Sequence, residues 1–207
     1  MNYRLFERIF KKIGMVSISQ IRASGQVFDK NNLGRWEKQD LIIKLKNGYY
    51  AFADMVDMRG FAYYAASKIY KPSYVSLHTA LAFYGITPES VTQITSVSSL
   101  KSSTFENKLG TFSYKKVKPS LMFGYNAMEN DGFTFFLATP EKALLDLLYL
   151  YPFYNSAEEI RNLRLDDYFM QNDLDWDKLA IFAKKFNKQT LLKRIELLRK
   201  IFLEDSI

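Results

Sequence analysis

Apolar positions near the start of the chain follow the spacing of short amphipathic helices. The first stripe recurs at helical spacing and comprises Leu5, Phe6, Ile9, Phe10 and Ile13. Gly14 ends it, and Ser17 can cap a second short helix in which Ile18 and Ile21 point inward. Asp29 is the expected cap of a third helix over 30–39, with Leu33 and Trp36 on its inner face.

The pattern then changes from helical spacing to that of a hairpin. Residues 41–46 read as a strand, Asn47-Gly48 is a strong hairpin turn signal, and residues 49–52 form the returning strand. Three short helices followed by a two-stranded hairpin is the order of a winged helix-turn-helix. We therefore predict such a domain over residues 1–55.

The remainder of the chain predicts helices, then short strands, then helices again. Expected helices cover 59–70 and 74–84 (capped by Ser73), one begins at Thr139-Pro140, and others cover 157–163, 176–186 and 190–203. Expected strands cover 91–97, 110–117, 121–125 and 133–137, with a polar turn over 126–132. The predicted fold class is α+β. The winged helix is followed by a mixed α+β domain over 56–207, with an antiparallel sheet and flanking helices.

Charge is unevenly distributed along the 207 residues, whose net charge is +7. Residues 1–50 carry ten Lys or Arg against four Asp or Glu, and residues 101–118 carry five lysines and one glutamate. Residues 119–183 are acidic, most densely from Glu158 to Asp177. DNA would be drawn to the N-terminal part and repelled by the acidic stretch.

The third helix and the wing carry side chains that suit sequence-specific DNA binding. The outer face of the helix offers Lys30, Asn31, Asn32, Arg35 and Lys38. Arginine can pair bidentately with guanine and asparagine with adenine in the major groove. The wing offers Lys44, Lys46 and Asn47 to DNA phosphates. Glu37 and Asp40 flank the same helix and oppose an anionic partner.

Several classes of chemistry are excluded or weakened by the residues present. There is no cysteine and one histidine, His78, so thiol catalysis, cysteine-ligated zinc and a histidine-based triad lack their residues. Asp173, Asp175 and Asp177 have the spacing that opens a calcium loop, but lysine stands where glycine and glutamate are required. We expect a non-enzymatic protein without a cofactor, a metal or a small-molecule substrate.

No apolar run approaches the ~20 residues that span a bilayer, and the N-terminus is charged, so we expect a cytoplasmic protein without a membrane partner. Two alternatives stay open. One is a protein-interaction module whose working surface is the basic segment 101–118 or the acidic segment 158–177. The other is a metal-dependent nuclease using Glu89, Glu106 and Lys108, in which Glu106-Asn-Lys108 matches the E-x-K half of a short nuclease motif and Glu89 would be the upstream partner.

Two long segments resemble the AbiEi antitoxin family. The first covers residues 71–89, KPSYVSLHTALAFYGITPE, with ITSV at 94–97, and the second covers residues 135–149, FFLATPEKALLDLLY. Together with the predicted winged helix, the resemblance covers roughly residues 1–150. The apolar content of both segments indicates that they mainly define the fold.

This resemblance implies a bacterial two-domain regulator of a type IV toxin–antitoxin phage-defence system. Its N-terminal domain would bind promoter repeats in double-stranded DNA and repress its own operon. Its C-terminal domain would counteract a nucleotidyltransferase-like toxin. By residue, the resemblance assigns DNA contact to basic positions of the third helix and wing, here Lys30, Arg35, Lys38, Lys44 and Lys46.

Overall fold

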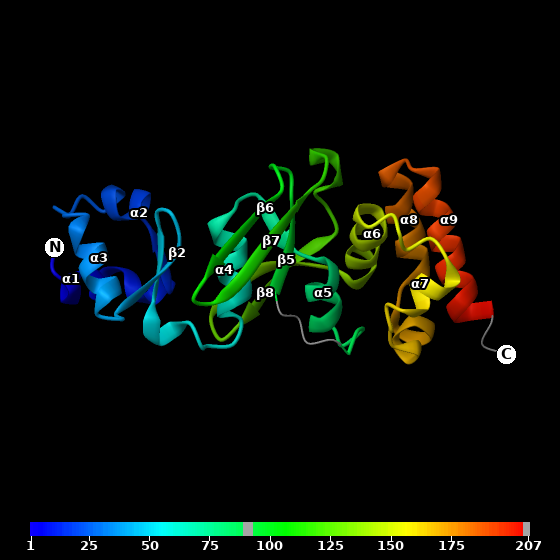
Figure 1. The fold of residues 1–207 in the computed structure, drawn as a ribbon, viewed down its shortest axis with the longest axis horizontal. Helices are drawn as coiled ribbons and strands as arrows, with labels where there is room; N and C mark the ends of the chain where they lie inside the picture. Colours follow the sequence, from blue (N-terminus) through cyan, green and yellow to red (C-terminus); the bar gives the residue numbers. More distant parts are fainter. Residues whose placement is uncertain (89–92, 205–207) are drawn as a thin grey trace.

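A computed structural model describes residues 1–88 and 93–204, and its parts follow one another along the long axis (Figure 1). Small helices and a small sheet lie at the N-terminal end, a larger sheet lies in the middle, and helices form the C-terminal end. The N-terminal part contains α1 (Tyr3–Phe10), η1 (Lys11–Ile13), β1 (Met15–Ser17), α2 (Ile18–Ala23), α3 (Asn31–Lys38), β2 (Ile42–Lys46), β3 (Tyr49–Phe52) and η2 (Ala53–Met55).

The three N-terminal helices and the hairpin confirm the predicted winged helix. The side chain of Ser17 accepts from the backbone N–H of Gln20, whose side chain accepts from the N–H of Ser17, which forms a capping box at α2. Asp29 is not the cap of α3, because the helix begins at Asn31 and Lys30 occupies the N-cap position without a side-chain bond; the Asp29 carboxylate, one residue earlier, accepts from the N–H of Asn31. Gly48 has a φ of 84°, so the Asn47-Gly48 turn needs its glycine.

Both faces of the small sheet are buried. Its strand order is β1-β3-β2, and β1 is a strand that the sequence pattern did not predict. One face packs against the three helices, and the strand residues that it contributes to this core are Val16, Ile42 and Phe52. The other face belongs to the large core of the second part, through Met15, Ile43, Leu45 and Ala51. The small sheet therefore joins the two parts, and a boundary at residue 55 stays a prediction.

A mixed six-stranded sheet forms the centre of the molecule. Its strands are β4 (Ser73–Val75), β5 (Gln93–Ser98), β6 (Ser103–Asn107), β7 (Gly110–Lys116), β8 (Tyr125–Asn130) and β9 (Phe133–Ala138), in the order β6-β7-β5-β4-β9-β8. The pairs β5–β7 and β4–β9 are parallel, whereas the other neighbours are antiparallel. The expected α+β class is confirmed, with a sheet that is mixed rather than wholly antiparallel.

Helices pack against this sheet and then against one another toward the C-terminal end. They are α4 (Phe61–Ile69), α5 (Leu77–Phe83), α6 (Pro140–Leu150), α7 (Ala157–Arg161), α8 (Trp176–Phe186) and α9 (Gln189–Arg199), with the 3₁₀ helix η3 (Pro119–Leu121) and the π-helical segments η4 (Phe169–Asp173) and η5 (Lys200–Glu204). α4 lies across β9, β4 and β5, and α6 contacts α5, α8 and α9. Thr139 caps α6 and Pro140 opens it, as the sequence predicts.

Three predictions in the second part are wrong. Ser73 does not cap a helix over 74–84, because Ser73–Val75 is the central strand β4 and the helix begins at Leu77. Of the expected strand over 121–125, Leu121 ends the 3₁₀ helix η3 and only Tyr125 belongs to a strand. The expected polar turn over 126–132 is mostly strand β8.

Candidate nucleic-acid interface

The inner side of α3 is held by an aromatic cluster. Trp36 is 7% exposed, and its ring centroid lies 4.8 Å from that of Phe6, 5.5 Å from Tyr3 and 5.9 Å from Phe28. Leu33, one turn earlier, is also buried. Trp36 is therefore a core residue, as expected, and not a platform for a base. Its burial fixes which face of α3 points outward.

The outer side of α3 exposes most of the predicted DNA-contacting residues. Lys30, Asn31, Arg35 and Lys38 are all exposed. The Arg35 guanidinium lies 3.6 Å from the Asp29 carboxylate, but both side chains are more than half exposed. An exposed pair of this kind contributes about 0–1 kcal/mol, so Arg35 can exchange it for a stronger partner.

Asn32 is placed differently from its neighbours. It is half-buried, and its side-chain amide donates to the backbone carbonyl of Met1 at 3.2 Å. Its amide is therefore partly committed within the N-terminal part. Of the two asparagines predicted to read bases, Asn31 is the one that faces outward.

Gly34 lies on the outer side of α3, and no neighbouring atom requires a glycine at this position. It is exposed and has no positive φ. A Cβ built at this position would meet no atom within 4 Å. Glycine inside a helix costs roughly 0.5–1 kcal/mol relative to alanine, and the fold gains nothing visible in return. The sequence pattern did not single out this residue.

The two wing lysines point to different sides of β2. Lys44 is exposed, whereas the Lys46 ammonium donates to the backbone carbonyl of Ile69 at 3.0 Å. It also lies over the rings of Tyr70 and Phe105, at 4.9 and 4.6 Å from their centroids. Partial burial lowers the pKa of Lys46. In this position Lys46 joins the wing to the second part and does not project toward a DNA backbone.

A shift in strand register explains this difference. Lys44 pairs with Tyr50, but the register changes before Lys46, which pairs with Tyr49. Such a bulge re-aims a side chain to the other face of a strand. Lys44 and Lys46, which the sequence assigns together to DNA phosphates, therefore have different surroundings.

Further contacts hold the wing against the second part. The side chain of Asn107 donates to the carbonyl of Leu45 at 2.9 Å, and the Lys108 ammonium pairs with Asp40 at 2.7 Å. Hydrogen bonding to Lys108 also lowers the pKa of the Asp40 carboxyl. Asn47 remains exposed at the tip. One of the two acidic residues that would repel DNA near α3 is thus paired with a lysine.

The alternative chemistries gain no support from the described geometry. Glu106 is exposed on β6, Lys108 is engaged by Asp40, and Glu89 lies outside the described residues. Within 1–88 and 93–204, no group of three or more His, Cys, Asp or Glu side chains is placed to hold a metal ion. The carboxylate of Asp175 accepts from the backbone N–H of Lys178 and caps α8, which gives it a structural role.

A buried polar cluster occupies the region of the family resemblance. Lys142 and Asp146 form an ion pair in which both side chains are fully buried. Tyr74 and Ser76 donate to the Asp146 carboxylate, each at 2.9 Å, and the Lys142 ammonium donates to the Tyr74 hydroxyl at 2.8 Å. Burial lowers the pKa of Lys142 and raises that of Asp146.

This cluster links β4 to α6, the elements that the two resembling segments form. Its members have at most a trace of exposed surface, so a substrate cannot reach them. Breaking a buried ion pair by removing one partner is costly, because the other charge is left buried and unpaired. The cluster is therefore structural, in keeping with segments that define the fold.

No protein-family model matches this chain, and no curated protein matches it significantly. The resemblance to the AbiEi family therefore rests on the two segments alone. In the described part of the chain, no helix has the length and apolar character that crossing a bilayer requires.

Proposed function

We propose that this protein is a DNA-binding transcriptional repressor that regulates its own operon and serves as the antitoxin of a type IV toxin–antitoxin phage-defence system. The DNA-binding half of the proposal is supported by one observation above all. A winged helix presents Lys30, Asn31, Arg35 and Lys38 on the exposed side of α3, while Trp36 anchors the opposite side.

Each exposed side chain has a separate role in this proposal. Asn31 and Arg35 would contact base edges in the major groove, where Arg prefers guanine and Asn prefers adenine. Lys30, Lys38 and Lys44 would contact phosphates, as would Asn47 at the wing tip. Lys46 is withdrawn from this set because its ammonium is held by Ile69 and two aromatic rings.

The antitoxin half of the proposal rests on the family resemblance. A nucleotidyltransferase-like toxin would be its counterpart, encoded beside this chain. If the neighbouring gene product arrests growth when expressed alone, and co-expression of this protein relieves that arrest, this half of the proposal is supported. Continued arrest at matched expression levels would contradict it.

Electrophoretic mobility shift with the duplex upstream of the gene, against a scrambled duplex, tests the DNA-binding half. Arg35→Ala should reduce the preference for the upstream duplex, at a cost of ~1–3 kcal/mol if the contact is bidentate. Lys184→Ala, which removes an exposed lysine from α8, is the matched control and should leave binding unchanged. Equal affinity of the unmodified protein for both duplexes, or no binding, would favour the protein-interaction module instead.

A further inference from the structure

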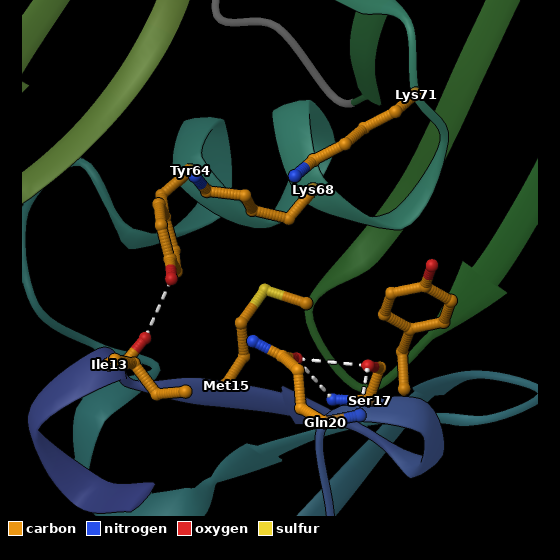
Figure 2. Close-up of a pocket in the computed structure, with 8 residues that line it drawn as sticks. Ile13, Met15, Ser17, Gln20, Tyr64, Lys68 and Lys71 are labelled. Carbon is orange, nitrogen blue, oxygen red and sulfur yellow. Dashed lines mark hydrogen bonds between the residues drawn. The ribbon is translucent and has the colours of Figure 1, made fainter. Parts of the chain in front are cut away.

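A cleft with both polar and apolar lining residues lies between the winged helix and α4. Its volume is about 450 Å³, and it is lined by Ile13, Met15, Ser17, Gln20, Tyr49, Tyr64, Lys68 and Lys71. Figure 2 shows β1 and the start of α2 on one side and α4 on the other. The Tyr64 hydroxyl donates to the carbonyl of Ile13 at 2.7 Å and closes one end between the two walls.

The α4 wall carries two positive charges. The Lys68 ammonium lies 5.1 Å from the centroid of the Tyr64 ring, and Lys71 follows α4 with an exposed side chain. Within the described residues, no carboxylate forms an ion pair with either ammonium. Burial and the charge of Lys71 together lower the pKa of Lys68. An anion in the cleft would offset the repulsion between the two lysines.

The opposite wall offers a hydrogen-bond donor that is already positioned. The Gln20 side-chain oxygen accepts from the N–H and the hydroxyl of Ser17, at 2.8 and 2.9 Å. This fixes the amide group, and Figure 2 shows its nitrogen directed into the cleft. Two lysines on the α4 wall and an oriented amide N–H on the opposite wall form a donor set that suits phosphate oxygens.

The place of the cleft within the winged helix indicates where a phosphate would come from. Gln20 belongs to α2, and in helix-turn-helix proteins the helix before the recognition helix crosses the DNA backbone. Tyr49, also in the lining, directly follows the exposed wing turn at Asn47-Gly48. A DNA strand that passes between α2 and the wing tip would bring its backbone to this cleft.

We propose that this cleft binds a phosphate of the DNA backbone, held by Lys68, Lys71 and Gln20. The inference rests on the proposed DNA-binding function and extends its interface from the winged helix onto α4. Because a phosphate contact is independent of base sequence, these residues set affinity and register rather than sequence preference. DNA bound in this way would also hold the second part of the molecule against the winged helix.

The salt dependence of DNA binding tests the inference. The double variant Lys68→Gln/Lys71→Gln should weaken binding to the upstream and scrambled duplexes alike. The slope of log K against log salt should become shallower by about 0.9 for each lost contact. Lys184→Gln on α8 is the matched control and should behave as the unmodified protein. Far-UV circular dichroism and the urea midpoint establish that each variant is folded.

The outcomes separate this inference from the proposed function. If Lys44→Ala weakens binding while the double variant retains the affinity and the salt slope of the unmodified protein, the cleft inference is wrong and the DNA-binding function stands. If the unmodified protein binds no DNA, both fail. If the double variant loses affinity for the upstream duplex alone, the lysines are not phosphate contacts.

A second measurement separates DNA phosphate from a free phosphorylated ligand. Inorganic phosphate is compared with chloride at equal ionic strength, with the unfolding midpoint as the readout. A phosphate-specific rise in the unmodified protein that disappears in the double variant, together with the loss of DNA affinity, supports the proposed cleft. The same rise with unchanged DNA binding would assign the cleft to a small ligand and overturn the inference.

Discussion

Replacement of Gly34 by alanine should make the protein more stable and a poorer DNA binder. Gly34 lies inside α3, has no positive φ, and leaves the space around a built Cβ empty. Alanine has less backbone freedom than glycine in the unfolded chain and loses less entropy on folding. The substitution should therefore raise the free energy of unfolding by roughly 0.5–1 kcal/mol. For a chain of this size, 1 kcal/mol corresponds to about 2–4 °C in the unfolding midpoint.

The expected loss of DNA affinity follows from the place of Gly34. It lies on the outer side of α3 between Asn31 and Arg35, so the groove would meet its backbone directly. An extra methyl group in a close-packed contact costs about 1–3 kcal/mol, which is roughly a 5- to 150-fold weaker binding constant. A gain in stability combined with a loss of binding cannot come from misfolding.

Fluorescence anisotropy with the upstream duplex and a urea titration measure both quantities on one preparation. Ala180→Gly on α8 is the reciprocal control, since Ala180 is exposed in a helix far from α3. It should lower stability by a similar amount and leave DNA affinity unchanged. If Gly34→Ala is more stable and binds DNA as tightly as the unmodified protein, the outer side of α3 is not in close contact with DNA.

Four further changes have distinct expected outcomes. Lys44→Ala should weaken binding to every duplex and make the salt slope shallower by about 0.9, with an unchanged urea midpoint; an unchanged slope contradicts this assignment. Lys46→Met should lower stability by about 1–3 kcal/mol in a urea titration through the lost hydrogen bond and ring contacts, and should alter the salt slope less than Lys44→Ala does. Asp146→Asn should cost about 3–5 kcal/mol in the same assay because the Lys142 charge stays buried without its counterion, and a cost below 1 kcal/mol would refute this role. Lys142→Met/Asp146→Leu together should cost less than Asp146→Asn alone.

Features specified by a few neighbouring residues could be predicted from the sequence. The Asn47-Gly48 turn, the Ser17 cap and the Thr139-Pro140 helix start each depend on local hydrogen bonds or backbone preferences. Leu33 and Trp36 were assigned to the core by helical spacing, because only one side of α3 can pack against the sheet.

Features that depend on distant partners could not be predicted. β4 lies between β5 and β9, so the three residues Ser73–Val75 become a central strand through pairings that no local pattern reveals. β8 has many polar residues because it is an edge strand with exposed positions, and it resembles a turn in the sequence. Such strands are recognised only when their partners are known.

The candidate site follows the same rule. The exposed residues of α3 could be predicted because helical spacing separates them from Trp36. The position of Lys46 depends on a register shift and on Tyr70 and Phe105, which lie far along the chain. The cleft at Lys68 requires that α4 lie opposite β1 and the start of α2, which only the tertiary structure determines.

Hydrogen exchange with and without the upstream duplex tests most directly whether the outer side of the winged helix binds DNA. Binding should slow exchange in α3 and at the Asn47-Gly48 turn, and leave α8 and α9 unchanged. A scrambled duplex at the same concentration should protect these segments less. Protection confined to the C-terminal helices, or none while the duplex is demonstrably bound, would contradict the assignment of α3 as the DNA-contacting element.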